Sequence, residues 1–260
     1  LVMKKIVYIS ESFLYRNIMF ISRLELRLIK LLLFLSIFLH LESFAQPTFQ
    51  WAKAIGGTSG DQGYSITTDA GGNVLSTGYF QGTVDFDPGT GMFNLTSVGI
   101  GDIFISKLDA SGNFIWAKDI GGTSGAGWGN SITTDAGWNV YTAGTFSGTV
   151  DFDPGVGVFN LTSAGSYDIF IFKLDATGNF IWAKSMGGGT GLDHSYSITT
   201  DVGGNIYTTG YFANTVDFDP GSGVFNLTAG TVDMFISKLD ASGNFIWAKA
   251  FIPSSASSVS

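Results

Sequence analysis

The sequence predicts an all-β fold, a β-propeller-like array of three four-stranded antiparallel blades of about 65–66 residues each. The first observation is an internal repeat, because tryptophan recurs at steps of 65, 66 and 65, at Trp51, Trp116, Trp182 and Trp247. The second is that residues 102–122 and 168–188 are identical at 17 of 21 positions, which indicates duplication. The third is that no helical period follows residue 45. Short runs of Ile, Val, Thr, Tyr and Phe are instead bounded by Gly, Asn and Asp.

Each repeat is predicted to form four strands, which we name a, b, c and d in chain order. In the second repeat we expect these strands at residues 130–135, 140–146, 168–175 and 180–185. Four antiparallel strands per repeat suit a propeller blade. A two-sheet sandwich is the structural alternative, but near-identical units favour radial or linear stacking. The repeat region, 46–253, divides into repeats at about 51–115, 116–181 and 182–247.

The two ends of the repeat region bear on how the array closes. Residues 49–55 have the sequence of a strand d that has no strand c to pair with. The last repeat already has its own strand d, at 244–250. Three blades are also fewer than the usual four to eight or so. We therefore expect an open arc, either a fragment of a longer protein or an array that completes a ring by self-association.

The lysines of the repeat region occupy only two repeat positions, one in strand c and one in strand d. With a turn at Ser111-Gly112, Lys107 is predicted to lie opposite Trp116 and Ile105 opposite Lys118. A Lys stem on a cross-strand Trp would stabilise the hairpin by about 0.5–1 kcal/mol. A Lys on the outer strand d also discourages edge-to-edge pairing. We interpret all seven as structural: Lys107, Lys173 and Lys238 in strand c, and Lys53, Lys118, Lys184 and Lys249 in strand d.

Three motifs carry a resemblance to a known repeat family. They are "GYSITTDAGGNVLSTGYF" (63–80), "TVDFDPG" (83–89) and "FISKLDASGNFIWAK" (104–118). The chain resembles, over residues 49–250, the SBBP-type bacterial β-propeller repeat found in exported and surface proteins of Gram-negative bacteria. The resemblance implies the fold and says little about activity. Family members commonly hold more repeats, and many end in a sorting domain, which the low-complexity tail "SSASSVS" (254–260) does not resemble.

Residues 1–45 have the features of a signal peptide or leader. The apolar run "LLLFLSIFLHL" (31–41) has the length of a signal-peptide core and is too short to span a bilayer. Basic residues precede it, and "SFAQ" (43–46) offers a cleavage site after Ala45. Met19 or Met3 is the expected true start. We predict export to the cell surface or the extracellular space, without membrane insertion after cleavage. A buried helix or an uncleaved anchor is the alternative.

The composition of the remaining chain excludes several partners. From Gln46 onward it carries 18 Asp, 7 Lys and no Arg, a net charge of −11. Such a surface cannot supply the clustered Lys and Arg that phosphate contacts require, so we expect no nucleic-acid partner. The chain has no Cys, so it forms neither a disulfide framework nor a thiolate metal site.

Catalytic constellations are nearly absent from the sequence. The exported region has a single histidine, His194, in what reads as a Gly-rich loop. "GGTSG" (56–60 and 121–125) lacks the Lys-Ser/Thr ending of a phosphate loop, and we interpret it as a flexible turn between blades. We therefore predict a non-enzymatic binding or structural scaffold with no cofactor, whose partner is a protein or a glycan. The alternative is a carbohydrate-active propeller that uses channel-facing Asp69, Asp135 and Asp201.

The hexapeptide "VDFDPG" occurs once in each repeat and allows two interpretations. Its acidic pairs could bind calcium, which takes six to eight oxygen ligands. Alternatively it forms a tight turn in which Val84 pairs with Leu95, Asp85 with Asn94 and Phe86 with Phe93. The aromatic face of that hairpin would then dock on the blade. The candidate calcium ligands are Asp85, Asp87, Asp151, Asp153, Asp217 and Asp219.

Overall fold

The computed structural model describes residues 28, 30 and 49–251. Residues 49–251 form strands and turns without a helix, and the strands build three four-stranded antiparallel sheets. The predicted all-β fold with three four-stranded blades is therefore confirmed. Apart from residues 28 and 30, the predicted leader (1–45) lies outside the described residues, as does the low-complexity tail (254–260), so both remain predictions.

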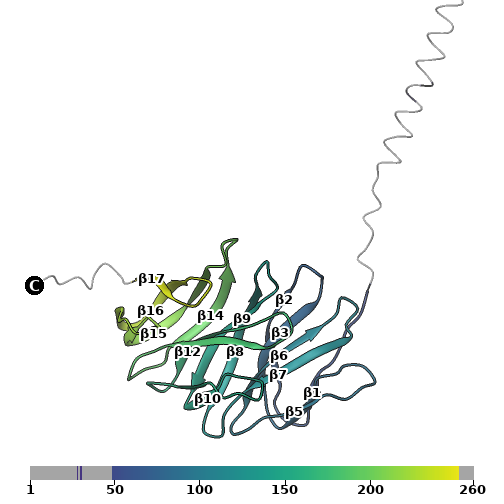
Figure 1. Ribbon diagram of the computed structural model, residues 1–260, viewed down its shortest axis with the longest axis horizontal. Coiled ribbons are helices and arrows are strands. Elements are labelled where there is room, and N and C mark those ends of the chain that lie inside the picture. Colours follow the sequence, from purple (N-terminus) through teal and green to yellow (C-terminus); the bar gives the residue numbers. More distant parts are fainter. Residues whose placement is uncertain (1–27, 29, 31–48, 252–260) are drawn as a thin grey trace, which may run out of the picture. The chain divides into compact units, whose positions relative to one another are not determined.

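Each blade contributes its four strands in the order a, b, c, d across the sheet (Figure 1). Blade 1 holds β2 (Gln62–Thr68), β3 (Val74–Phe80), β6 (Asp102–Leu108) and β7 (Phe114–Ile120). Blade 2 holds β8 (Ala126–Thr134), β9 (Val140–Ser147), β12 (Asp168–Leu174) and β13 (Phe180–Met186). Blade 3 holds β14 (His194–Thr200), β15 (Ile206–Asp217), β16 (Asn226–Leu239) and β17 (Phe245–Phe251).

A smaller hairpin stands between strands b and c of every blade. In blade 1 it is β4 (Thr83–Asp85) with β5 (Asn94–Thr96), and β4 also pairs with β1 (Gly56–Gly57). In blade 2 it is β10 (Thr149–Asp151) with β11 (Asn160–Thr162). In blade 3 the hairpin is formed by the same strands β15 and β16, beyond a register shift between Ala213 and Thr215. The pairs Val84–Leu95 and Asp85–Asn94 confirm the predicted register.

The hairpin docks on its blade through aromatic packing, as predicted. The Phe86 ring lies 5.4 Å from Phe80 and 5.2 Å from Phe104, and all three rings are buried. On the other strand of the hairpin, Phe93 lies 4.8 Å from Phe114 and is more exposed. The same arrangement recurs at Phe146, Phe152 and Phe170 and at Phe212, Phe218 and Phe235.

The c–d hairpins have the predicted register, with Lys107 opposite Trp116 and Ile105 opposite Lys118. The ammonium groups, however, turn toward strand b and the a–b turn that precedes it rather than onto the tryptophan. Lys107 pairs with Asp69 at 2.9 Å, and the Lys173 Nζ stands 4.9 Å from the centre of the Tyr141 ring. A carboxylate or a tyrosine face beside the lysine head supplies a stronger partner than an indole reached only by the stem.

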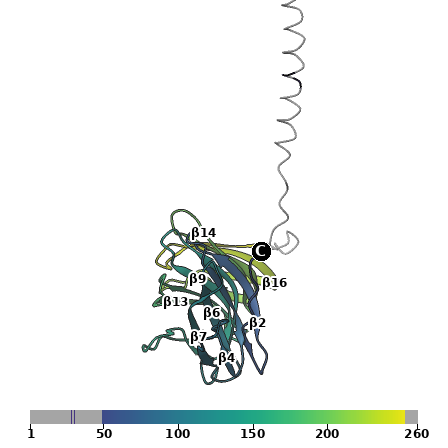
Figure 2. The same ribbon diagram turned by 90° about the vertical axis from the view of Figure 1, so that its right-hand side faces the viewer.

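The blades stack through their innermost strands. The Ile132 N–H of β8 donates to Ser65 Oγ of β2 at 3.3 Å, and the Ile198 N–H of β14 donates to Ser131 Oγ of β8 at 3.2 Å. In Figures 1 and 2, β9 of blade 2 lies between β14 of blade 3 and β6 of blade 1. Strand a is thus the inner strand of each blade and strand d the outer edge, the arrangement of a propeller.

Residues 49–55 do not form the strand that the sequence suggested. They lie outside every assigned strand, and regular pairing begins only at β1. Their side chains nevertheless take up strand-d positions, because a Cβ on Gly112 would contact Trp51 and Lys53 as one on Gly178 would contact Trp116 and Lys118. Without a strand c beside it, this segment has the packing of a strand d and lacks its hydrogen-bond ladder.

The paired glycines after each strand d are a close contact and not a flexible turn. Gly121 and Gly187 bridge to Asp151 and Asp217 of the next hairpin, as β1 bridges to β4. A Cβ on Gly122 would overlap the backbone carbonyl of Thr149, and Gly57 and Gly188 face the same obstacle from Thr83 and Thr215. Only glycine lets the two backbones approach here.

We expect Gly122→Ala to lower the free energy of unfolding by about 1–3 kcal/mol, because the added methyl group forces the blade 1 exit strand away from the blade 2 hairpin. Denaturant unfolding measures this change. Gly189→Ala is the matched control, since a Cβ there meets no atom within 4 Å. Equal stability of the two variants would show that the glycine contact does not constrain the fold.

Candidate functional site

The DFDPG carboxylates are occupied by the backbone of their own loops. Asp85 Oδ1 accepts hydrogen bonds from the N–H groups of Asp87 at 3.0 Å and Phe93 at 2.8 Å. Asp87 Oδ1 accepts the Gly89 N–H at 2.8 Å. Asp151 and Asp153, and Asp217 and Asp219, repeat these contacts. The arrangement matches the tight-turn interpretation, in which aspartate closes a loop through N–H groups.

The calcium interpretation of these loops stays a prediction. Among the residues that the structure describes, no group of three or more His, Cys, Asp or Glu side chains is placed to hold a metal ion. Each loop brings two carboxylates together, and at least one oxygen of each already accepts N–H groups. A calcium ion would therefore depend on backbone carbonyls and water for most of its six to eight ligands.

Calcium at a hundredfold excess over its Kd would add about 2.7 kcal/mol of stability and raise the melting temperature by roughly 5–10 °C. Because the loop N–H groups already occupy the acidic pairs, we expect melting to be the same in millimolar calcium and in chelator. Differential scanning calorimetry measures the difference. A rise of several degrees that Asp85→Asn abolishes would establish the metal site instead.

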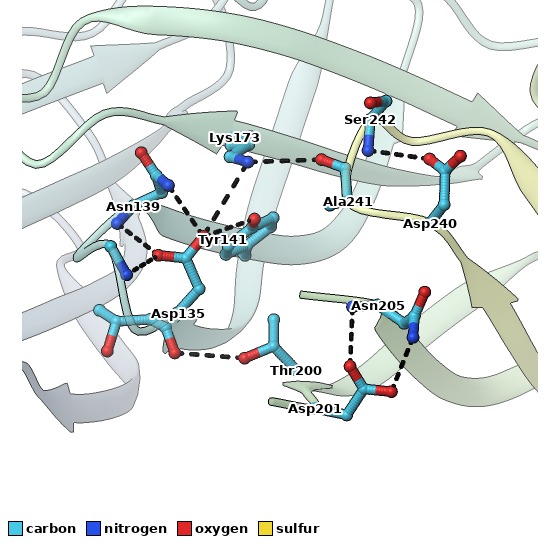
Figure 3. Close-up of polar contacts among 12 residues, drawn as sticks. Asp135, Asn139, Tyr141, Lys173, Thr200, Asp201, Asn205, Asp240, Ala241 and Ser242 are labelled. Carbon is cyan, nitrogen blue, oxygen red and sulfur yellow. Dashed lines mark hydrogen bonds and ion pairs between the residues drawn. The ribbon is translucent and has the colours of Figure 1, made fainter. Parts of the chain in front are cut away.

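Asp69, Asp135 and Asp201 hold the turns between strands a and b. Asp135 Oδ1 accepts the N–H groups of Gly137 and Asn139, and its Oδ2 accepts Asn139 Nδ2 and the Tyr141 hydroxyl at 2.8 and 2.9 Å (Figure 3). Burial raises the pKa of Asp135, but the hydrogen bonds from Asn139 and Tyr141 outweigh it and leave the pKa below its ordinary value. These carboxylates act as hydrogen-bond acceptors that order each turn.

A different set of acids, unremarked in the sequence, is buried between the blades. Asp102 is fully buried at the start of β6, where its Oδ2 accepts the Val98 N–H at 2.8 Å. Burial raises its pKa to about 7; the Val98 N–H opposes this shift and nearby Asp119 adds to it. Burial likewise raises the pKa of Asp193 to about 6, against two backbone N–H groups. These acids are structural residues whose neutral form the fold favours.

Stability should therefore depend on pH through Asp102. Because its folded pKa lies above the unfolded value, its stabilising contribution is complete below about pH 4 and is lost as the pH rises through about 7. We expect Asp102→Asn, which stays neutral, to raise the melting temperature by roughly 3–6 °C at pH 8 and to change it little at pH 4. Parallel melting curves check this. An Asn variant less stable at pH 8 would contradict the assignment.

A cleft lined by side chains of blades 2 and 3 lies at the opposite end of the inner strands from the a–b turns. A space of about 370 Å³ is lined by Trp128, Asn130, Thr145, Tyr167, His194 and Tyr196. Aromatic rings follow one another across it. Tyr79 of blade 1 stacks on Trp128 at 5.8 Å, Trp128 meets Tyr167 at 5.5 Å, and His194 stacks on Tyr211 at 4.8 Å. We call this space the aromatic cleft.

Polar atoms are interspersed among the rings of the aromatic cleft. Thr145 Oγ1 lies 3.1 Å from His194 Nδ1, and Asn130 Nδ2 donates to the Ser195 carbonyl at 2.9 Å. Burial lowers the pKa of His194, so the imidazole is neutral at physiological pH. The loop position expected for His194 was wrong, because it is the first residue of β14 and half-buried. No acid or lysine lines the cleft, which therefore suits an uncharged ligand.

The residues of the aromatic cleft stand where the three repeats differ. Gln62, Trp128 and His194 each lie three residues before the serine of "SITTD". Their cross-strand partners are Tyr79, Thr145 and Tyr211. The "SITTD" segment that follows on the same strand is identical in all three repeats. This difference between the repeats is the sequence signal that marks the site.

Comparisons with known proteins support the repeat fold. The chain is 28% identical over 229 residues to the uncharacterized WD repeat-containing protein L264 of Acanthamoeba polyphaga mimivirus. The match covers 76% of this chain and 16% of that protein, so the chain spans a small part of its relative. No family model matches. The relative's repeats and the three four-stranded sheets agree on a β-propeller-type repeat protein.

In the part of the chain that the structure describes, no helix has the length and apolar character needed to cross a membrane.

Proposed function

We propose that this protein is an exported, non-enzymatic binding module of the SBBP type that displays the aromatic cleft at the cell surface or in the extracellular space. The observation that carries the proposal is the cleft itself, which Trp128, Tyr167 and His194 line at positions where the three repeats differ. A repeat fold that keeps its packing residues constant and varies one face is typical of a scaffold that presents a binding surface.

The ligand class follows from the chemistry of the cleft. Flat rings such as Trp128 and His194 present π-faces that pack on the C–H face of a sugar ring, and Asn130 and Thr145 can exchange hydrogen bonds with hydroxyl groups. The volume of about 370 Å³ lies in the range of small-ligand sites. Since no charged side chain lines the cleft, the ligand is a neutral glycan.

A carbohydrate-active enzyme is disfavoured because the acids and the cleft lie apart. Trp128 stands near the start of β8, and Asp135 follows its last residue, on the order of 20 Å along the strand. Asp135 is also fully engaged by its own turn. Turnover of chromogenic glycosides that Asp135→Asn abolishes would overturn the non-enzymatic reading.

We expect soluble neutral oligosaccharides of glucose, galactose, mannose or N-acetylglucosamine to bind in calorimetric titration. Trp128→Ala should weaken the binding at least tenfold, about 1.4 kcal/mol, because it removes the central ring. Trp138→Ala is the matched control, since this exposed tryptophan lies in the β8–β9 turn at the far end of the strands. Equal weakening by both variants, or no binding by any member of the panel, would contradict the glycan site.

We expect the secreted protein to begin at Gln46, because the apolar run at 31–41 and the "SFAQ" site place cleavage after Ala45. Intact-mass measurement of protein recovered from the medium or cell surface checks the cleavage position. Retention of residues 31–45 would show an uncleaved anchor instead.

A further inference from the structure

Two apolar clusters hold the three blades together, and each is built in the same way. One joins Ile103, Ile105 and Ile120 of blade 1 to side chains of blade 2 such as Ile132. The other joins Ile169, Ile171 and Met186 of blade 2 to side chains of blade 3 such as Ile198. We call the face of a blade that packs on the blade after it in sequence its forward face. The face that packs on the blade before it is its backward face.

The backward face of blade 1 lacks the cover that the other two receive. Ile66 is 69% exposed, whereas its equivalents Ile132 and Ile198 are 4% and 5% exposed. A third cluster, of Phe80, Val84, Phe86, Phe104 and Ala117, forms only half of a blade-to-blade core. Beside it lies a cleft of about 190 Å³ that Ser76, Phe80 and Phe104 help to line.

The forward face of blade 3 is likewise not covered by another blade. Met234 is 61% exposed, whereas its equivalents Ile103 and Ile169 are fully buried. Lys107 and Lys173 donate to the turn carbonyls of Ala176 and Ala241 in the following blade. Lys238 occupies the same position in blade 3, which has no following blade among residues 49–251.

The segment 51–55 already fills one position on the backward face of blade 1. A Cβ on Gly112 would contact Trp51 and Lys53, just as Gly178 faces Trp116 and Lys118, and Gly243 faces Trp182 and Lys184. The segment therefore stands as the strand d of a preceding blade whose strands a to c are not among residues 49–251. Its sequence also matches β17, because residues 49–55 (FQWAKAI) and 245–251 (FIWAKAF) agree at five of seven positions.

We propose that a second copy of this chain supplies strands a to c of that blade. The forward face of blade 3 in one copy packs on the backward face of blade 1 in the next, and residues 51–55 of that copy pair with β16. They replace β17, since Trp247 and Trp51 would otherwise meet the same glycine. Two copies exchanging strands in both directions hold six blades, within the range of about four to eight found in closed propellers.

The exchange is favourable because one ladder replaces an equivalent ladder while new apolar surface is buried. Trp51 takes the place of Trp247 opposite Lys238, and Lys53 takes that of Lys249 opposite Ile236. Displaced β17 loses its contacts with β16, and the burial of Ile66, Met234 and the rest of the new seam offsets that loss. In the dimer, the Lys238 ammonium donates a hydrogen bond to the Ala110 carbonyl of the other copy. Lys107 and Lys173 use the equivalent carbonyls within one chain.

The mass of the full chain tests the association. Protein refolded from denaturant at several concentrations, so that strands are free to exchange, should sediment as a dimer at micromolar concentration. Ile66→Asp and Met234→Asp should each give monomers, whereas Val156→Asp, at an exposed loop tip, should leave the dimer unchanged. Monomeric wild-type protein at every concentration, or loss of dimer in only one face variant, would overturn the proposal.

Mixing the two face variants tests the head-to-tail direction. Each variant keeps one intact face, so the mixture has one complete seam and should regain a dimer that neither variant forms alone. A symmetric contact between identical faces predicts no such recovery.

Engineered cysteines test the strand register, since the natural chain has none. Ala52→Cys with Ser237→Cys should give a disulfide-linked dimer on a non-reducing gel, because Ala52 replaces Ala248, the partner of Ser237. The equivalent pair within one blade, Ser106→Cys with Ala117→Cys, is the control and should link within the monomer. Linkage in the control without any linked dimer would overturn the exchange.

Discussion

The contact between blades is the interaction on which the rest of this structure depends. A four-stranded sheet with apolar side chains on both faces is not stable alone, so each blade must bury its forward face against the next. Ile103 and Ile105 meet β8 in this way, and Ile169 and Ile171 meet β14. Each seam also needs glycine where the exit of one blade crosses the hairpin of the next.

The acidic character of the chain is a consequence of its turns. Aspartate stands at the head of the a–b and c–d turns, where one carboxylate oxygen accepts two backbone N–H groups. The DFDPG loops use aspartate for the same purpose. A turn-rich repeat thereby accumulates negative charge without any site that requires it.

Because the three repeats are nearly identical, they differ at few positions, and the proposed binding surface lies at those positions. Packing fixes the residues at the seams, so a substitution there costs stability in every blade. The positions of Gln62, Trp128 and His194 lie at the open ends of the inner strands, where packing constrains them less. Diversity at such positions can build a binding surface without disturbing the core.

The sequence alone determined the repeat, the strands of each blade and their register. These properties depend on contacts within one repeat, such as Lys107 opposite Trp116 or Val84 opposite Leu95, which alternation and turn residues specify.

Only the tertiary structure decided what depends on neighbouring blades. The aromatic cleft joins Trp128 and His194, which stand one repeat apart in sequence. The burial of Asp102 and the unpaired backbone of residues 51–55 likewise depend on which blade stands beside them. The stacking of the blades brings such residues together or leaves them exposed. No local pattern of apolar and polar residues encodes which blade stacks on which.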